Sequence, residues 1–169
     1  MENQTQAQSS TFLEKELELI LKDSKKNQST VLKQVLACTY IAAYNKAHDL
    51  KILDTTQVTS LGDYFALITV DNVPAALGLS DQILYHMKKL GLHLISREGN
   101  KETDWILMDY GDFVIHIFIG VARARYDLDE LWINAPRIEI PQEFFLHGIN
   151  NQNVLNQNNS KNSDIEDYL

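Results

Sequence analysis

The sequence predicts an α+β fold in which helices pack on a mixed β-sheet of about five strands. Three observations support this fold class. Apolar residues recur at helical spacing in several segments, apolar runs of strand length lie between these segments, and a Tyr-Gly pair separates two of the runs. With 169 residues, 44% of them hydrophobic, the chain can bury one core. We therefore expect one folded domain over residues 29–147, with an appendage at each end.

The appendages differ in composition from the domain. Within residues 1–28, Ser10 or Thr11 can cap a short amphipathic helix, with Glu14 placed for a capping box. Its apolar stripe consists of Leu13, Leu17, Ile20 and Leu21. Such a short helix is marginal alone, so we expect it to pack on its own domain or to stay partly disordered. Residues 148–169 are rich in Asn, Gln and Ser and end acidic, which predicts a disordered tail.

The first half of the domain predicts one helix and two strands. The helix starts after Ser29 and ends near His48. Its buried face consists of Val31, Leu32, Val35, Leu36, Thr39 and Ala42. A short strand over 50–53 and a polar loop over 55–61 follow. The next strand, over 63–70, is apolar on both faces, which is typical of a central strand covered on both sides.

A second helix follows this central strand. Asn72 and Pro74 open it, since Pro is tolerated in a first turn, and Gly91 ends it. A strand is predicted over 92–96, and a charged loop over 97–103 leads to the next strand. We therefore expect a strand on each side of this helix.

The Tyr110-Gly111 pair predicts a tight hairpin, in which Asp109 opposes Asp112 across a two-residue loop. Pairing then continues outward, Leu107 with Val114 and Trp105 with His116. One hairpin face is a core face, carrying Ile106, Met108, Phe113, Ile115, Ile117 and Ile119. The other face carries Trp105, Leu107, Val114, His116 and Phe118, edged by Asp109 and Asp112. This second face is too apolar for water, so another layer of this chain or a partner must cover it.

Short helical turns over 121–132 come after the hairpin, and they contain further site candidates. Tyr126 and Trp132 can extend the apolar face, although we expect Trp132 to fold back into the domain. Asp127 is expected to cap a helix, and Asp129 to be a solvated acid. Pro136 and Pro141 halt further helix formation.

Composition argues against several other classes of protein. The net charge of −8 opposes general binding to nucleic acid, which needs clustered Lys and Arg. The single cysteine, Cys38, is expected to be a buried thiol and excludes a disulfide framework. The five histidines show no metal-ligand spacing. No run approaches the roughly 18 apolar residues of a membrane span, and no secretory signal opens the chain, so a cytoplasmic protein is expected.

A metal-dependent nucleotidyl or phosphoryl transferase remains the alternative. Such an enzyme needs carboxylates that converge on adjacent metal ions, and Asp104, Asp109 and Asp112 are the candidates. Asp104 falls on the opposite strand face from Asp109 in the predicted register. No Gly-rich phosphate loop precedes a helix. We therefore expect Asp109 and Asp112 to flank a solvated turn, with no catalytic residues, metal or cofactor.

Three motifs occur in a fixed order along the chain: Asp63–Phe65, Asp104–Phe118, and Arg125–Trp132 followed by Ala135-Pro136. Together they resemble the ribosomal silencing factor family (RsfS/Iojap), over about residues 30–136. The resemblance implies a fold related to nucleotidyltransferases but without their catalytic carboxylates. It also implies a repressor of translation that is not an enzyme and that acts when nutrients are short. Such a factor binds a large-subunit ribosomal protein where the small subunit would join, and blocks joining sterically.

The resemblance implies that the family's partner-contacting tryptophan falls on Trp105. Our predicted partner-binding residues are Trp105, Leu107, His116, Asp109, Tyr110, Asp112 and Tyr126. The same face could instead pair with a second copy of the chain as a homodimer. The chain departs from the family at Val70–Pro74, where a Gly-Thr-Ser stretch and a basic residue are usual, and in the acidic turn over 97–102.

Overall fold

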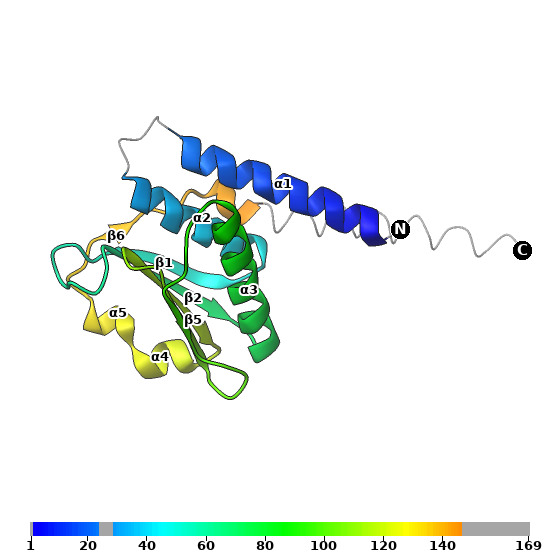
Figure 1. Ribbon diagram of the computed structural model, residues 1–169. Helices are drawn as coiled ribbons and strands as arrows, with labels where there is room; N and C mark the ends of the chain where they lie inside the picture. The colour runs from blue at the N-terminus through cyan, green and yellow to red at the C-terminus, as the bar shows by residue number, and fades with distance from the viewer. Residues whose placement is uncertain (1, 24–28, 147–169) are drawn as a thin grey trace, which may run out of the picture.

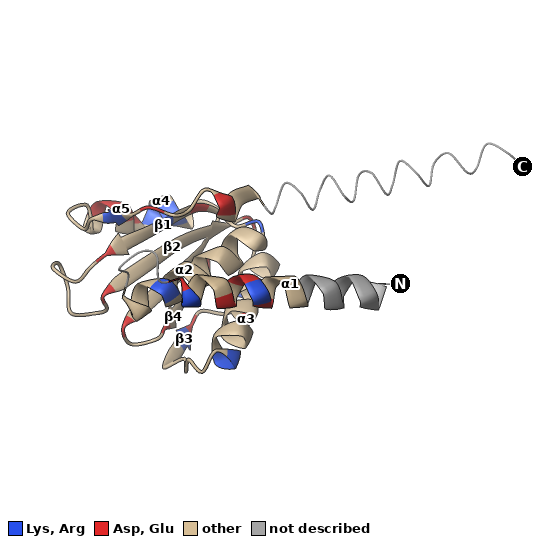
Figure 2. Ribbon diagram, turned by 90° about the horizontal axis from the view of Figure 1, so that it is seen from above, with Lys and Arg blue, Asp and Glu red and all other residues tan. Residues whose placement is uncertain are grey.

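A mixed β-sheet separates two helical layers, with α1–α3 on one face and α4 and α5 on the other (Figures 1 and 2). This computed structural model describes residues 2–23 and 29–146. In chain order the elements are α1 (Glu2–Lys22), α2 (Thr30–Tyr44), β1 (His48–Asp54), β2 (Tyr64–Val70), α3 (Val73–Lys89), β3 (Ser96–Glu98), β4 (Trp105–Asp109), β5 (Phe113–Ile119), α4 (Ala122–Tyr126), α5 (Leu128–Leu131) and β6 (Arg137–Ile138). The predicted α+β class is confirmed.

The sheet has the strand order β3-β4-β5-β2-β1-β6, within the described part of the chain. β2 and β5 run parallel, and the other neighbouring pairs are antiparallel. Residues Phe65 to Val70 of β2 are all buried, which confirms a central strand covered on both sides. The sixth strand was missed because Arg137–Ile138 is too short to show a pattern of alternation.

The predicted starts of α2 and α3 agree with the structure. The Ser29 hydroxyl accepts a hydrogen bond from the Leu32 N–H (3.1 Å), and the Asn72 side chain accepts one from the Ala75 N–H (2.9 Å). Each bond satisfies one of the donors that a first helical turn leaves unpaired. The end of α2 differs from the prediction: it stops at Tyr44, and the chain from His48 already belongs to β1.

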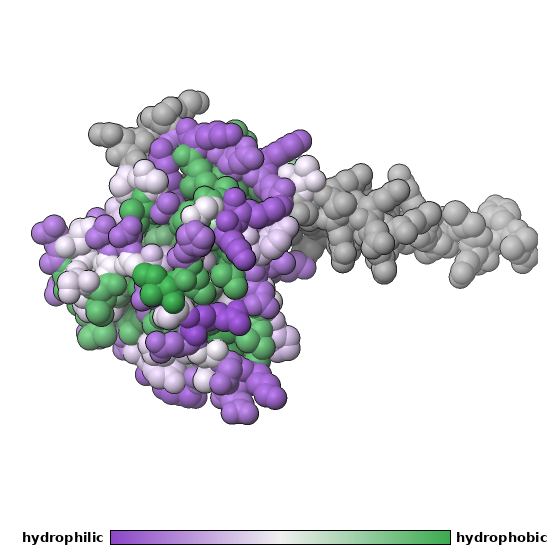
Figure 3. Space-filling view, viewed as in Figure 1, coloured by the Kyte–Doolittle hydropathy of each residue, from purple (hydrophilic) through white to green (hydrophobic). Residues whose placement is uncertain are grey.

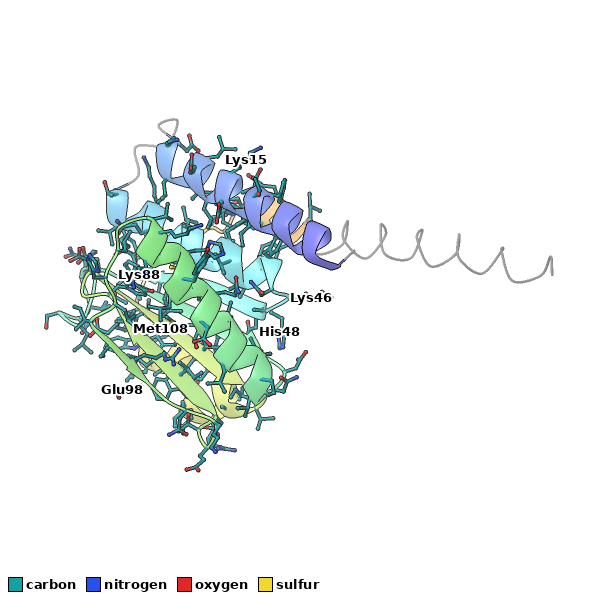
Figure 4. The ribbon with its side chains drawn as sticks, turned by 45° about the vertical axis from the view of Figure 1, so that its right-hand side comes forward. Lys15, Lys46, His48, Lys88, Glu98 and Met108 are labelled. Atoms are coloured by element: carbon teal, nitrogen blue, oxygen red, sulfur yellow. The ribbon has the colours of Figure 1, made fainter. Side chains whose placement is uncertain are left out.

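The main core lies between α1–α3 and the sheet. It includes the buried thiol of Cys38, as predicted, and Met108, which Figure 4 shows in the region covered by α3. Leu13 and Leu17 of α1 are buried in this core, so α1 packs on the domain. The predicted cap at Ser10 or Thr11 is wrong, because α1 begins at Glu2.

The strand predicted over 92–96 is also wrong, because β3 spans Ser96–Glu98. Ser96 pairs with Asp109, the last residue of β4. Residues before this pair extend beyond the end of β4, and few strand partners are available to them. Leu92 and Leu94 pack against the main core without forming a ladder, while Ile95 is 68% exposed.

Apolar side chains reach the surface in several places, as Figure 3 shows for one side of the molecule. Apolar atoms contribute more than half of the accessible surface of folded proteins, so exposure alone does not mark a binding site. No helix in the described ranges is long and apolar enough to cross a bilayer. The predicted tail over 148–169 lies outside the described residues.

Candidate partner-binding site

The hairpin joining β4 to β5 has a different register from the predicted one. Asp109 pairs with Val114, Leu107 with His116, and Trp105 with Phe118. The Tyr110 N–H donates to the Phe113 carbonyl (3.0 Å), so Gly111 and Asp112 form the tight loop. Gly111 has a φ of +86°, which glycine adopts without steric cost. The correction is therefore a shift of two residues in every pair.

The two faces of the hairpin are nevertheless the predicted ones, because a shift of two leaves every side chain on its own face. The core residues Ile106, Met108, Phe113, Ile115 and Ile117 pack toward the helices. The opposite face, which we call the Trp105 face, carries Trp105, Leu107, Val114, His116 and Phe118.

The Trp105 face is covered in part by this chain. Ala122, Leu128 and Ala135 form a second, smaller core with it. Trp132 is half-buried there, with its ring edge-on to Phe65 at a centroid distance of 5.7 Å. The expected folding back of Trp132 is confirmed by this packing. At the Trp105 end of the face, the covering layer borders a groove.

Trp105 lies in a cluster of aromatic rings. Its ring stacks on Phe118, with a centroid distance of 5.2 Å and an interplanar angle of 23°. The ring of Tyr126, on α4, is tilted relative to the indole with a centroid distance of 4.7 Å, and the His116 ring lies at a centroid distance of 5.6 Å. These contacts fix the indole in a half-buried position, with the rest of its surface open to a neighbouring groove.

The groove beside Trp105 has a volume of about 630 Å³. Its lining residues are Val73, Glu98, Gly99, Lys101, Glu102, Thr103, Asp104, Trp105, Leu107, Arg125 and Tyr126. The apolar surfaces of Trp105 and Leu107 are therefore bordered by charged side chains, the composition expected of a protein interface. Figure 4 shows Glu98 at the sheet edge, across the molecule from α1 and its Lys15.

One wall of the groove is a loop fixed by its own hydrogen bonds. Gly99 has a φ of +100°, and a Cβ there would lie 2.5 Å from the Trp105 carbonyl oxygen. The Thr103 hydroxyl accepts from the Asn100 N–H (2.8 Å), and the Asn100 side chain accepts from the Glu102 N–H (2.7 Å). Gly99 therefore permits a close approach of backbones beside Trp105.

His116 lies under Trp105 and is only 5% exposed. Its ring is edge-on to Phe65 at 5.2 Å, and neither ring nitrogen has a hydrogen-bond partner among the described residues. Burial lowers the pKa of His116 to about 4, and the charge of Arg123 adds to this shift. At neutral pH the ring is therefore uncharged, and it supports Trp105 as an apolar side chain would.

The other predicted site residues lie at the turn of the hairpin. Asp112 is exposed, and Asp109 is half-buried with its carboxylate accepting the Gly111 N–H (2.7 Å). This bond is typical of an Asx turn. Tyr110 lies elsewhere: it is 9% exposed, belongs to the main core and stacks on Phe113 at 4.9 Å. Tyr110 thus has no place on the Trp105 face.

The two short helices that cover the Trp105 face are held by a buried arginine. Arg123 is 7% exposed and donates to the Asp129 carboxylate (2.6 Å) and to the Asp49 carbonyl (3.0 Å). Lys51 also pairs with Asp129. The prediction of Asp129 as a solvated acid is wrong, because Asp129 is half-buried between two cations. Asp127 does cap α5, accepting the Glu130 N–H (3.4 Å).

Asp104 is paired with α4 rather than with Asp109 or Asp112. Its carboxylate accepts from Arg125 Nη1 (2.5 Å) and from the Tyr126 hydroxyl (3.1 Å). Across the described ranges, no group of three or more His, Cys, Asp or Glu side chains could hold a metal ion. Asp109 and Asp112 therefore belong to the hairpin turn, whereas Asp104 belongs to a separate cluster with α4.

A family model decides which family this chain belongs to. The model described as "Ribosomal silencing factor during starvation" matches residues 28–167. The chain belongs to the ribosomal silencing factor family. This match confirms the resemblance seen in the three motifs, and it extends beyond them at the C-terminal end.

Curated relatives agree with this membership. The ribosomal silencing factor of Bacillus subtilis is 28% identical over 114 residues, which cover 68% of this chain and 94% of the relative. That of Chromobacterium violaceum is 31% identical over 87 residues, or 52% of this chain and 71% of the relative. The chloroplastic protein Iojap of Zea mays is 31% identical over 99 residues, which cover 57% of this chain and 42% of the relative.

Solved structures support the silencing factor fold. A crystal structure of a Chromobacterium violaceum protein, 28% identical, superposes with a TM-score of 0.54 and covers 63% of this chain and 90% of that protein. A Bacillus halodurans structure at 23% identity shows the same fold, with a TM-score of 0.55 and coverages of 64% and 96%. The mixed α+β architecture described above is thus that of known proteins.

Several residues around the silencing factor's groove were missed by sequence reasoning. Arg123 and Arg125 were not singled out, because a basic residue in a short helix gives no sign of which carboxylate it will meet. Gly99 did carry a signal, since a lone glycine in a charged loop indicates a positive φ or a close approach. Val73 reaches the groove only through the fold, from the start of α3.

Proposed function

We propose that this silencing factor represses translation by binding a protein of the large ribosomal subunit through the Trp105 face and its groove. The bound factor then occupies the surface that the small subunit needs for joining. The observation that carries the proposal is the half-buried indole of Trp105 beside an open groove. Family membership supplies the connection with the ribosome and with regulation of translation.

The chemistry of the groove favours a protein partner over RNA. Its lining includes three acidic residues (Glu98, Glu102 and Asp104) and two basic ones (Lys101 and Arg125). Arg125 is already paired with Asp104. Phosphate recognition relies on unpaired Lys and Arg, and the whole chain carries a net charge of −8. Within the ribosome, an acidic surface of this kind suits a basic ribosomal protein.

The proposed contact residues differ in their roles. Trp105, Leu107 and Tyr126 line the groove and would contact the partner directly. Asp109 and Asp112, near the tip of the hairpin, would extend the contact along one edge. His116 would act from beneath, by supporting the indole. A central aromatic anchor of this kind commonly contributes about 2 kcal/mol or more, roughly thirtyfold in affinity.

The mechanism we propose is steric, so it needs no catalytic step, metal or cofactor. The factor competes with the small subunit for one surface, and repression depends on its occupancy. In the cytoplasm, the factor would bind free large subunits. The names of the relatives describe silencing factors, which fits a regulator rather than an enzyme.

A subunit-joining assay tests this function. Purified large subunits are incubated with the factor, small subunits are added, and joined ribosomes are measured on a sucrose gradient. At a factor concentration near the dissociation constant of the parent, we expect the parent to reduce joining and Trp105→Ala to leave joining close to its level without factor. Tyr85→Ala, which removes an exposed aromatic ring from α3 on the other side of the sheet, should still block joining. Full joining in the presence of saturating parent protein would falsify the proposal.

A further inference from the structure

We propose that Asp104 is a positioning residue for Trp105. By accepting hydrogen bonds from Arg125 and Tyr126 of α4, it would hold the Tyr126 ring against Trp105 and so keep the indole in the orientation that the partner binds. This inference rests on the proposed function, since the positioning matters for binding only if Trp105 contacts the partner. Asp104 itself would act through the neighbouring aromatic rings.

Asp104 joins three parts of the structure at one point. Its backbone carbonyl accepts the Ile119 N–H (2.9 Å), which fixes it at the end of the hairpin. One carboxylate oxygen accepts from Arg125 Nη1 (2.5 Å), and the other from the Tyr126 hydroxyl (3.1 Å). Charge-assisted bonds of this kind are stronger than bonds between neutral groups.

Trp105 contacts three rings, and these rings are held differently. Phe118 and His116 are buried, so their positions follow from the core. Tyr126 is 42% exposed, so little packing restrains it beyond its contacts with Trp105 and Phe118. Its hydroxyl bond to Asp104 therefore supplies the missing restraint. Without that bond, only the buried rings of β5, Phe118 and His116, would hold the indole firmly.

The shortness of α4 makes this restraint necessary. The helix has five residues, and a single turn is unstable without tertiary contacts. Ala122 and Arg123 anchor its first half, through the small core and the Asp129 carboxylate. Its second half, which carries Arg125 and Tyr126, meets Asp104. The Asp104 contact is thus the outer anchor of α4, beside the groove.

A side chain that is already fixed loses less freedom when a partner binds. Immobilising one flexible interface side chain costs an amount equivalent to about a two- to tenfold loss of affinity. Removing the Asp104 carboxylate should therefore weaken partner binding by about that factor, while the fold remains. The opposite arrangement, in which Tyr126 blocks Trp105 and must move away, predicts tighter binding instead.

The test uses the full chain with Trp132→Phe, which leaves Trp105 as the fluorescent tryptophan. Asp104→Asn and Tyr126→Phe are introduced separately, and Asp81→Asn is the matched control. Asp81 pairs with Arg97 at 2.6 Å, a surface Asp–Arg pair like that of Asp104. Fluorescence anisotropy and acrylamide quenching report the mobility of Trp105 in the free protein. Sedimentation with purified large subunits reports affinity.

We expect Asp104→Asn and Tyr126→Phe to lower the anisotropy, to increase quenching and to weaken binding about two- to tenfold. Asp81→Asn should change none of these, and thermal melting should confirm that all variants fold. Unchanged anisotropy in both variants, or unchanged or tighter binding, would overturn the inference. Retained binding by Trp105→Ala would instead overturn the proposed function, while the free-protein fluorescence would still show whether Asp104 restrains Trp105. No binding by the parent would overturn both.

Discussion

Trp105 and Phe118 lie directly opposite each other on β4 and β5, and their rings stack at 5.2 Å. The pairing is a consequence of the hairpin register, which places Gly111 and Asp112 in the loop. Phe118 is therefore the platform on which the proposed anchor rests. Cross-strand aromatic pairs of this kind stabilise a sheet and orient both side chains.

Phe118→Ala should be strongly destabilising. The ring is fully buried, and removing a buried Phe side chain costs about 3–5 kcal/mol through lost transfer energy and the cavity it leaves. Urea unfolding followed by circular dichroism measures this loss. Phe145→Ala is the control, because Phe145 is 43% exposed and should cost at most about 0.5 kcal/mol. Equal losses for the two variants would show that Phe118 is not a core platform.

His116 should make stability depend on pH. Its pKa in the folded protein, about 4, lies below the unfolded value of 6.5, so between these values the unfolded state binds more protons. Stability is therefore lost as pH falls through this window. Because of His116, the free energy of unfolding should fall by about 2 kcal/mol between pH 7 and pH 5.

His116→Leu tests this contribution. At pH 7 we expect no loss of stability, or a small gain, because both ring nitrogens lack a partner among the residues described. At pH 5 the variant should be more stable than the parent by about 2 kcal/mol. Unfolding free energies at the two pH values give the comparison. The same pH dependence in parent and variant would contradict the assignment to His116.

Arg123 and Arg125 belong to the same short helix, but Arg123 should contribute more to the free energy of unfolding. Arg123→Met removes a buried cation from Asp129 and from two further acceptors, so we expect a loss of about 2–3 kcal/mol. In the Arg125–Asp104 pair, Arg125 is 61% and Asp104 35% exposed, so Arg125→Met should cost about 0–1 kcal/mol. Urea unfolding of both variants measures the difference. A larger loss for Arg125 would reverse our view of how α4 is anchored.

Gly99→Ala should destabilise the groove wall. The residue has a positive φ, and its Cβ would meet the Trp105 carbonyl oxygen at 2.5 Å, so we expect a cost of about 1–3 kcal/mol. Gly78→Ala should instead stabilise the protein, because a Cβ at this position of α3 would have nothing within 4 Å. There we expect a gain of about 0.4–1 kcal/mol. Thermal unfolding of the two variants distinguishes these signs.

The sequence predicted the faces of the hairpin better than its register. Alternation assigns a residue to a face by whether its number is odd or even, and an error of two residues changes nothing in that assignment. The register depends on which residue takes the positive φ of the loop, and Gly111 takes it at the first loop position. Tyr110 was misplaced for the same reason, since it extends β4 toward the main core.

The aromatic surface could be predicted, but the contacts that hold it could not. Trp105, Leu107 and Phe118 follow from local alternation along two neighbouring strands. Arg123 and Asp129 meet through the turn between α4 and α5, and Asp104 meets Arg125 and Tyr126 across 21 and 22 residues. Such pairs depend on the tertiary path of the chain, and a single sequence contains no local pattern for them.

The central claim is that Trp105 anchors the factor on the large ribosomal subunit. Co-sedimentation of the purified factor with large subunits, over a range of concentrations, gives the dissociation constants of the parent, Trp105→Ala and Tyr85→Ala. We predict that Trp105→Ala binds at least about thirtyfold more weakly, while it melts as a folded protein and Tyr85→Ala binds like the parent. A dissociation constant for folded Trp105→Ala equal to that of the parent would contradict the account.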